Sequence, residues 1–250
     1  MWGIIPAAGK GSRIQPLAFS KELLPLGASS DEKPRPKAVS DFLMERLVLA
    51  GARRICFVIS PEKSDILQYY SRSNWDASIC FVVQRTPQGL CDALFQAIPF
   101  ISDDEPVLVG LPDTISFPED GLRRLPDDRF SFLLFPVGDP QFFDSVEQDA
   151  EGRVTRIRVK DPAAQSNLIW GAFKMPGSVF HELHELWLER NRSDEYIGTL
   201  VNEWMERGGE AWGVAAGTRY CDVGTMGGYL DAMRVLGENP AAATAGRQSA

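Results

Sequence analysis

Short apolar runs alternate with longer helical segments along the first half of the chain. The runs are apolar almost throughout, as expected for strands covered on both faces, and they span residues 3–7, 54–60, 78–84 and 106–112. The segments between them carry the 3.6-residue period of helices and span residues 38–51, 61–70 and 89–98. This alternation predicts an α/β fold with a parallel sheet, whose ligands bind beyond the carboxyl ends of the strands.

The second half of the chain has a looser pattern. It predicts a buried strand at 130–137, a hairpin turning at Glu151 and Gly152, a strand at 168–175, helices near 178–190 and 194–207, two short strands within 211–222 and a final helix at 225–236. Residues 237–250 have no periodicity and few bulky apolar side chains, which predicts a disordered tail. We therefore expect a single domain over residues 1–236.

Charge and hydropathy exclude several classes of partner. The formal net charge of −8 argues against a nucleic-acid partner and against an anionic membrane surface, both of which favour a basic face. No run approaches eighteen apolar residues, and no basic segment precedes the apolar start of the chain. The sequence therefore predicts a cytoplasmic protein without a transmembrane span or signal peptide.

Cysteine and histidine spacing does not favour a zinc site. The four cysteines lie far apart and form no C-x-x-C pair, so we expect reduced, mostly buried thiols. His181 and His184 are three residues apart, which places them on one face of a predicted helix. A metal pair is one interpretation, but a packing role in an amphipathic helix is the simpler one.

The loop after the first predicted strand reads G-K-G-S-R. Backbone N–H groups from Gly9 to Ser12 are left uncovered by small residues and can point at an anion. Arg13 and Lys21 add two positive charges within the same short segment, which favours a phosphate cradle over an ordinary tight turn. The Walker spacing is absent, and Ile14 stands where a dinucleotide-binding fingerprint needs its third glycine.

Two aspartates follow predicted strands in distant parts of the chain. Asp113 ends the run V-G-L-P-D, and Asp222 lies in Y-C-D-V-G-T before the last predicted helix. Each is a candidate cap for a turn or helix, or a ligand for a divalent cation. Because Mg²⁺ is commonly held by one or two carboxylates together with substrate phosphates, this pair would suffice.

Five colinear motifs across residues 2–236 resemble the sugar-1-phosphate nucleotidyltransferases, the family of glucose-1-phosphate thymidylyltransferase and UTP–glucose-1-phosphate uridylyltransferase. The first, P-A-A-G-K-G-S-R-I-Q-P-L-A-F-S-K-E-L-L-P-L, is similar to the family form G-x-G-T/S-R, then P-L, then K-E-L/M-L-P. The others are V-V-Q-R-T-P-Q-G-L-C-D-A-L, V-G-L-P-D-T, V-K-D-P-A-A-Q-S-N and D-V-G-T-M-G-G-Y-L-D-A. The resemblance implies a Rossmann-like, GT-A-type nucleotidyltransferase fold with a central, mostly parallel mixed sheet flanked by helices.

The resemblance also implies an activity, in which a sugar 1-phosphate attacks the α-phosphorus of a nucleoside triphosphate, with dTTP or UTP favoured, and releases pyrophosphate. Residues of about 1–125 would bind the nucleotide and those of about 126–236 the sugar phosphate. By match to the family, Arg13, Lys21 and Lys160 would be catalytic, and Asp113 and Asp222 would hold Mg²⁺. The nucleotide would contact Ala8, Gly9, Gly11, Ser12, Gln84 and Gly89, and the sugar would contact Asp144, Asn167 and Gly171.

Two departures from the family pattern affect the acceptor side: Phe143 and Asp144 stand in place of a Tyr-Gly pair, and Val159 stands where a sugar-binding glutamate is usual. The loop at 27–37 is also longer and more charged than the family's, and the sequence assigns it no role. Three alternatives therefore stay open: a non-glucose acceptor, a non-sugar phosphate acceptor, and a silent nucleotide-sugar-binding protein. A glycosyltransferase would need a D-x-D motif, which L-P-D-T does not supply. A homo-oligomer is also open, because Trp187 and Trp204 could lie in the core or in an interface.

Overall fold

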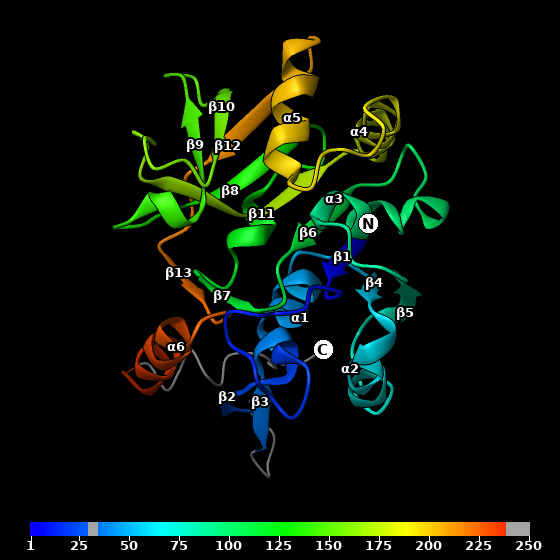
Figure 1. Ribbon diagram of the computed structural model, residues 1–250, viewed down its shortest axis with the longest axis vertical. Helices are drawn as coiled ribbons and strands as arrows, with labels where there is room; N and C mark the ends of the chain where they lie inside the picture. The colour runs from blue at the N-terminus through cyan, green and yellow to red at the C-terminus, as the bar shows by residue number, and fades with distance from the viewer. Residues whose placement is uncertain (30–34, 239–250) are drawn as a thin grey trace.

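A computed structural model of the chain describes residues 1–29 and 35–238. Its first half is built on four parallel strands, in the order β6-β1-β4-β5 (Figure 1). They are β1 (Trp2–Pro6), β4 (Arg54–Ile59), β5 (Ser78–Val83) and β6 (Val107–Gly110). The predicted parallel arrangement is confirmed, so the carboxyl ends of these strands lie at one edge of the sheet.

The second half continues the same nine-stranded sheet in a mixed arrangement. β11 (Leu168–Met175) pairs antiparallel with β6 and so joins the two halves. The other strands are β8 (Phe130–Pro136), β9 (Asp144–Gln148), β10 (Val154–Val159) and β12 (Ala211–Val214). β9 and β10 form the predicted antiparallel hairpin, and β12 runs parallel to β8.

Two small sheets lie outside this framework. β2 (Pro25–Ala28) pairs with β3 (Pro36–Ala38), and β7 (Thr114–Phe117) pairs antiparallel with β13 (Arg219–Asp222). β2, β3 and β7 were not predicted, because strands of three or four residues are too short to carry a clear period-2 pattern. The β7–β13 pair matters for the site because it links the end of β6 to the last part of the chain.

Helices cover both faces of the large sheet, whereas α6 (Met226–Glu238) packs against β13 and β2 of the small sheets (Figure 1). The other α-helices are α1 (Val39–Leu49), α2 (Ser64–Tyr70), α3 (Leu90–Phe95), α4 (Gly177–Glu189) and α5 (Ile197–Glu206). Short 3-10 helices span Lys21–Leu23, Pro61–Lys63, Ile98–Phe100, Gly121–Arg124 and Pro140–Phe142. The predicted start of the tail is wrong by two residues, because α6 continues through Gly237 and Glu238; residues 239–250 lie outside the described part.

The core lies on both sides of the sheet, which explains why the central strands are apolar throughout. On one side Ile5 and Phe57 pack in a cluster with the α1 residue Leu47, and on the other Ile4 and Val58 pack in a cluster with residues of α3, α4 and α5. The tryptophans of the last helices belong to the second cluster: Trp187 and Trp204 are 3% and 9% exposed. They are therefore core residues of this chain.

The cysteines and histidines behave as the simpler interpretation predicts. All four cysteines are free thiols, and three of them are buried. His181 Nε2 lies 3.0 Å from the carbonyl oxygen of Ile101, and His184 packs against the rings of Phe95 and Trp187. Over residues 1–29 and 35–238 no three metal-ligating side chains gather into a cluster. None of the helices in this part is long and apolar enough to cross a membrane.

Candidate active site

The loop after β1 lies at the carboxyl edge of the sheet, as predicted. The Ala7 N–H donates to the carbonyl oxygen of Val58 at 2.7 Å, which holds the start of the loop against β4. Ala8 is buried, whereas Gly9 and Ser12 are exposed, so the loop rises from the core to the surface. Gly11 has a φ of +65°, and a Cβ there would lie 2.7 Å from Cδ of Lys21. Glycine at this position therefore lets the Lys21 side chain cross the loop.

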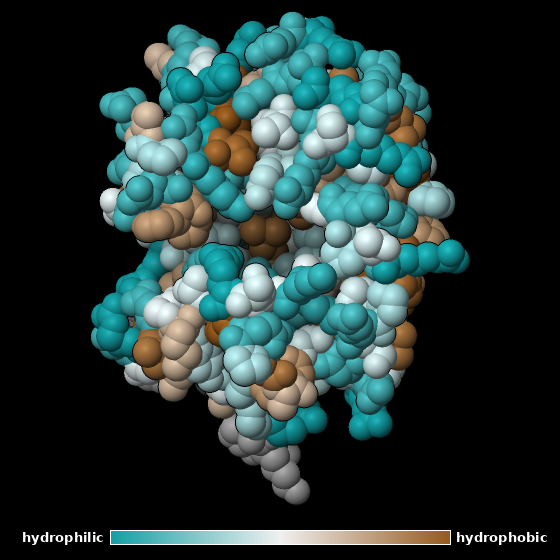
Figure 2. Space-filling model, viewed as in Figure 1, coloured by the Kyte–Doolittle hydropathy of each residue, from teal (hydrophilic) through white to brown (hydrophobic). Residues whose placement is uncertain are grey.

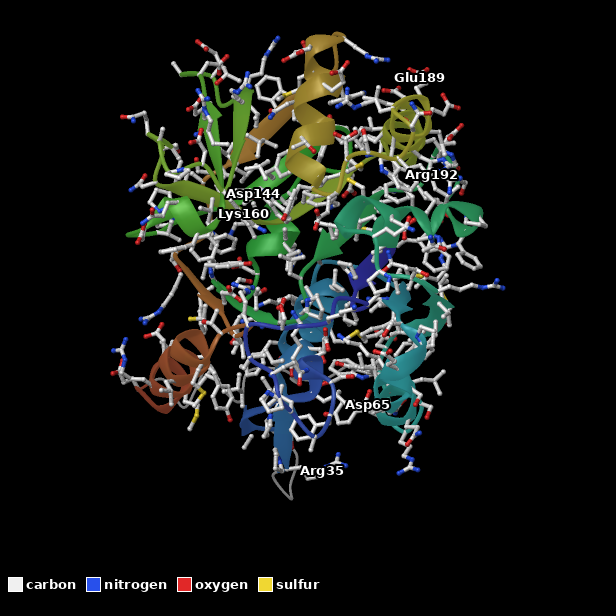
Figure 3. All side chains as sticks on the ribbon, viewed as in Figure 1. Arg35, Asp65, Asp144, Lys160, Glu189 and Arg192 are labelled. Atoms are coloured by element: carbon white, nitrogen blue, oxygen red, sulfur yellow. The ribbon has the colours of Figure 1, made fainter. Side chains whose placement is uncertain are left out.

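The segment that carries Lys21 is fixed by two buried polar contacts. Lys63 Nζ donates to both carboxylate oxygens of Glu22, at 2.7 and 2.9 Å. Ser20 donates through its backbone N–H and its hydroxyl to the Asp65 carboxylate on α2, at 2.7 and 2.6 Å, and Figure 3 labels this aspartate. Glu22 is only 1% exposed, so its charge is matched inside the protein. These contacts anchor Lys21 between the first loop and α2.

Lys21 reaches across the sheet edge to Asp113, which lies between β6 and β7. The Nζ–Oδ2 distance is 2.5 Å, and both side chains are mostly buried, at 14% and 13% exposed. Burial acts to raise the pKa of Asp113, but the Lys21 ammonium outweighs it and leaves that pKa below its usual value. Burial likewise acts to lower the pKa of Lys21, and the carboxylates of Asp113 and Glu22 raise it instead. Both groups are therefore charged at neutral pH.

The β7–β13 pair places Asp222 beside Asp113, because Asp222 is the register partner of Thr114. The Val223 N–H donates to the Asp113 carbonyl at 2.9 Å, which ties the two segments together. Arg13 Nη1 lies 2.9 Å from Asp222 Oδ2. The four predicted charged residues of the phosphate and metal sites are thus joined in two ion pairs.

Gly224 marks the point where these charges converge. A Cβ built on it would lie 2.8 Å from Asp222 Oδ1, 2.9 Å from Asp113 Oδ2 and 3.0 Å from Arg13 Nη2. The two carboxylates reach one point next to the loop after β1, and carboxylate oxygens are ligands that Mg²⁺ prefers. Any side chain at position 224 would fill this space.

Gln84 and Gly89 lie at the end of β5, on the same edge of the sheet. Gln84 is 2% exposed, and its Nε2 donates to the Asp92 carboxylate on α3. Gly89 has a φ of +97°, and a Cβ there would lie 2.8 Å from Cα of Glu195. The Leu90 N–H donates to the Glu195 carbonyl at 2.8 Å. Gly89 therefore allows the first half of the chain to contact the second half closely.

The predicted sugar-side residues lie in the second half. Lys160 has a φ of +45°, and its Nζ lies 3.1 Å from the Tyr196 hydroxyl and 4.2 Å from the Tyr196 ring centroid. Asp144 begins β9, and Figure 3 shows it close to Lys160. Burial raises the pKa of Asp144, although the Lys160 ammonium partly opposes this. The Asn167 carbonyl accepts a hydrogen bond of 2.9 Å from the Val137 N–H, so the backbone of Asn167 is committed to the fold.

One residue that the sequence did not single out lies between the two groups. Burial raises the pKa of Tyr220 on β13, and the carboxylates of Asp222, Asp113 and Asp144 raise it further. A Cβ on Gly171 would lie 2.6 Å from Cε2 of Tyr220, so this glycine makes room for the ring. Figure 2 shows a hollow in the surface between the two halves of the chain. The only hint of Tyr220 in the sequence is its place two residues before Asp222.

A sequence profile described as Nucleotidyl transferase matches residues 2–239, which includes both halves and both aspartates. The chain belongs to this family. The resemblance to sugar-1-phosphate nucleotidyltransferases is confirmed by the relatives of this nucleotidyl transferase.

A glucose-1-phosphate thymidylyltransferase of Mycolicibacterium smegmatis is 28% identical over 246 residues, covering 93% of this chain and 81% of the relative. UTP–glucose-1-phosphate uridylyltransferase AglF of Haloferax volcanii is 26% identical over 214 residues, covering 83% and 85%. A UTP-bound UGPase from Acinetobacter baumannii superposes with a TM-score of 0.77 at 21% identity, covering 96% of this chain and 94% of that structure. These likenesses cover 83% to 96% of this nucleotidyl transferase, and the solved structure supports the predicted fold.

Proposed function

We propose that the protein transfers a nucleotidyl group from dTTP or UTP to a sugar 1-phosphate, with Mg²⁺ held by Asp113 and Asp222. The products are a nucleoside-diphosphate sugar and pyrophosphate. The observation that carries this proposal is the convergence of Arg13, Lys21 and the two aspartates at one edge of the sheet. The names of the thymidylyltransferase and uridylyltransferase relatives support the choice of substrates.

The triphosphate binds in the first half, along the loop after β1. Backbone N–H groups of Ala8, Gly9, Gly11 and Ser12 face phosphate oxygens, and Arg13 and Lys21 hold the β and γ phosphates. In the free protein these two cations are paired with the aspartates, so triphosphate binding exchanges each carboxylate for phosphate oxygens. Mg²⁺, when bound, would neutralise charge at the α-phosphate. The charges of Asp113 and Asp222, which lose their cation partners in this exchange, would be balanced by the same ion.

The acceptor binds in the second half, with its phosphate on Lys160. An oxygen of that phosphate attacks the α-phosphorus, the bond to the bridging α–β oxygen breaks, and pyrophosphate leaves opposite the attacking oxygen. Such a reaction asks little covalent chemistry of the protein, so positioning and charge stabilisation supply most of the acceleration. We assign contacts with the rest of the acceptor to Asp144, Asn167 and Gly171, although Gly171 is packed against the Tyr220 ring.

A second acceptor class is favoured by one feature of this end of the site. The side chain of Val159, which precedes Lys160, offers no hydrogen bond to a hydroxyl group, and Asp144 is a carboxylate whose pKa burial raises and the lysine acts to lower. A site with fewer matched polar groups discriminates less strongly between hydroxyl patterns. The same machinery could therefore use a sugar other than glucose, or a non-sugar phosphate, as its acceptor.

The test is pyrophosphate release from purified protein with Mg²⁺, five nucleoside triphosphates and a panel of sugar 1-phosphates. We expect turnover with dTTP or UTP, and loss of turnover in Lys21→Ala and in Asp113→Asn. Turnover that persists in both variants would contradict the assignment of the site. Binding of a triphosphate without turnover on any sugar phosphate would favour the non-sugar acceptor or a silent binding protein.

A further inference from the structure

Asp92 is a buried carboxylate that the proposed reaction does not use. It lies in the first turn of α3, and it is 7% exposed. Two side-chain amides surround it: Gln84 Nε2 donates to Oδ2, and Gln96 Nε2 lies 3.5 Å from Oδ1 and 3.3 Å from the Asp92 carbonyl. Asp92 therefore accepts hydrogen bonds from both side-chain amides.

This contact fixes which way the Gln84 amide faces. An ionised carboxylate can only accept hydrogen bonds, so the amide must present its NH₂ group to Asp92 and turn its oxygen away. Gln84 is 2% exposed, and its own backbone N–H is bound to the Ile59 carbonyl at 2.9 Å. A flip of the amide would set an oxygen against a carboxylate inside the protein, which is strongly unfavourable.

Gln84 lies where the base of a bound nucleotide would reach. β4 lies between β1 and β5 in the sheet. At the usual spacing between strands, the end of β5 therefore lies about 10 Å from the loop after β1. The strands are parallel, so these two strand ends face the same edge of the sheet. The base-facing group of Gln84 is then Oε1, an acceptor.

We propose that Asp92 is a positioning residue that locks the Gln84 amide with its oxygen toward the base, and so makes the site select uracil or thymine over cytosine. The proposal rests on the nucleotide site described under Proposed function. Ring atom N3 carries a hydrogen in uracil and thymine and donates to Oε1. The same atom in cytosine is an acceptor, so it would face Oε1 with no hydrogen between them and leave a buried polar pair unmatched.

The test is the affinity of Mg²⁺ complexes of UTP, dTTP and CTP, measured by titration calorimetry without any acceptor. We expect the unmodified protein to prefer UTP over CTP by about tenfold or more, the effect of one matched hydrogen bond. In Asp92→Asn the new amide can pair with either face of the Gln84 amide, so the preference falls about tenfold. Gln96→Ala removes the other donor to Asp92 and keeps the preference.

The ratio of the UTP affinity to the CTP affinity distinguishes a positioning role from a general loss of structure, because a folding defect weakens the binding of all three triphosphates alike. UTP methylated at N3 probes the same contact in the unmodified protein, and it should bind about tenfold more weakly than UTP. An unchanged ratio in Asp92→Asn, or equal binding of UTP and N3-methyl-UTP, would overturn the inference and leave the transferase intact. If the unmodified protein bound no triphosphate, the nucleotide site itself would be wrong, and the inference with it.

Discussion

Replacing Gly224 by alanine tests the convergence of charge at the site. The added methyl group would lie 2.8 Å from Asp222 Oδ1, 2.9 Å from Asp113 Oδ2 and 3.0 Å from Arg13 Nη2. Ordinary contacts of a methyl carbon begin near 3.4 Å, so the groups around it must move apart by about half an ångström. Asp222 is paired with Arg13, and Asp113 is paired with Lys21, so neither carboxylate can move without disturbing its cation.

We expect kcat/KM for nucleotidyl transfer to fall about 100-fold in Gly224→Ala, because displacements below 1 Å at a reacting centre have effects of this size. The matched control is Gly227→Ala, three residues along the chain. A Cβ at Gly227 meets nothing within 4 Å, and it lies in the first turn of α6, where alanine favours the helix.

The assay is steady-state pyrophosphate release for both variants, with thermal unfolding as the check of structure. The apparent Mg²⁺ requirement should rise in Gly224→Ala and stay unchanged in Gly227→Ala. If Gly224→Ala matched Gly227→Ala in kcat/KM and in its Mg²⁺ requirement, the two aspartates would not form the reacting centre.

Three further predictions concern the charges around this centre. Lys63→Ala leaves the buried Glu22 carboxylate unpaired and should lower the free energy of unfolding by about 3–5 kcal/mol, as measured by urea denaturation. Asp144→Asn should raise the free energy of unfolding at pH 7, because burial raises the pKa of this carboxyl and disfavours its charged form. The gain should vanish below the usual pKa of 3.8, where the carboxyl is protonated in both the folded and the unfolded chain. The same variant should lower kcat/KM for the acceptor about tenfold. Because Lys21 lowers the pKa of Asp113, their pair stabilises the fold above pH 3.8 and loses this contribution as the pH falls through the lowered pKa; acid unfolding of Lys21→Met should lack that step.

The central strands and the loop after β1 could be predicted from the sequence because each is recognised from a short stretch of neighbouring residues. Strands covered on both faces are apolar throughout, and the loop is a short run of small and basic residues. The roles of Asp113 and Asp222 stayed ambiguous without the family, since each alone has the pattern of a cap. What brings them together is a four-residue pairing between β7 and β13, more than 100 residues apart in the chain. Short strands were predicted within 211–222, but β7 is a four-residue strand without a clear period-2 pattern, so the pairing could not be predicted.

Other parts of the site depend on contacts that no sequence pattern reports. Lys63 reads as a surface lysine in a polar segment, yet it pairs with the buried Glu22. Gln84 was predicted to contact the nucleotide, but the carboxylate that accepts its amide hydrogen bond comes from the next helix. Lys160 was predicted to be catalytic, and its contact with Tyr196 depends on how α5 packs against β10. Part of the charged loop at 27–37, residues 30–34, lies outside the described residues.

The most direct test of the account follows the α-phosphate of the nucleotide. The protein is incubated with Mg²⁺, glucose 1-phosphate and UTP or dTTP labelled with ³²P at the α position, and the products are separated. We predict that the label appears in a nucleoside-diphosphate sugar, that the released pyrophosphate is unlabelled, and that Asp113→Asn and Asp222→Asn each abolish the product. Label in free nucleoside monophosphate alone, or product formation that is unaffected in both variants, would contradict nucleotidyl transfer at this site.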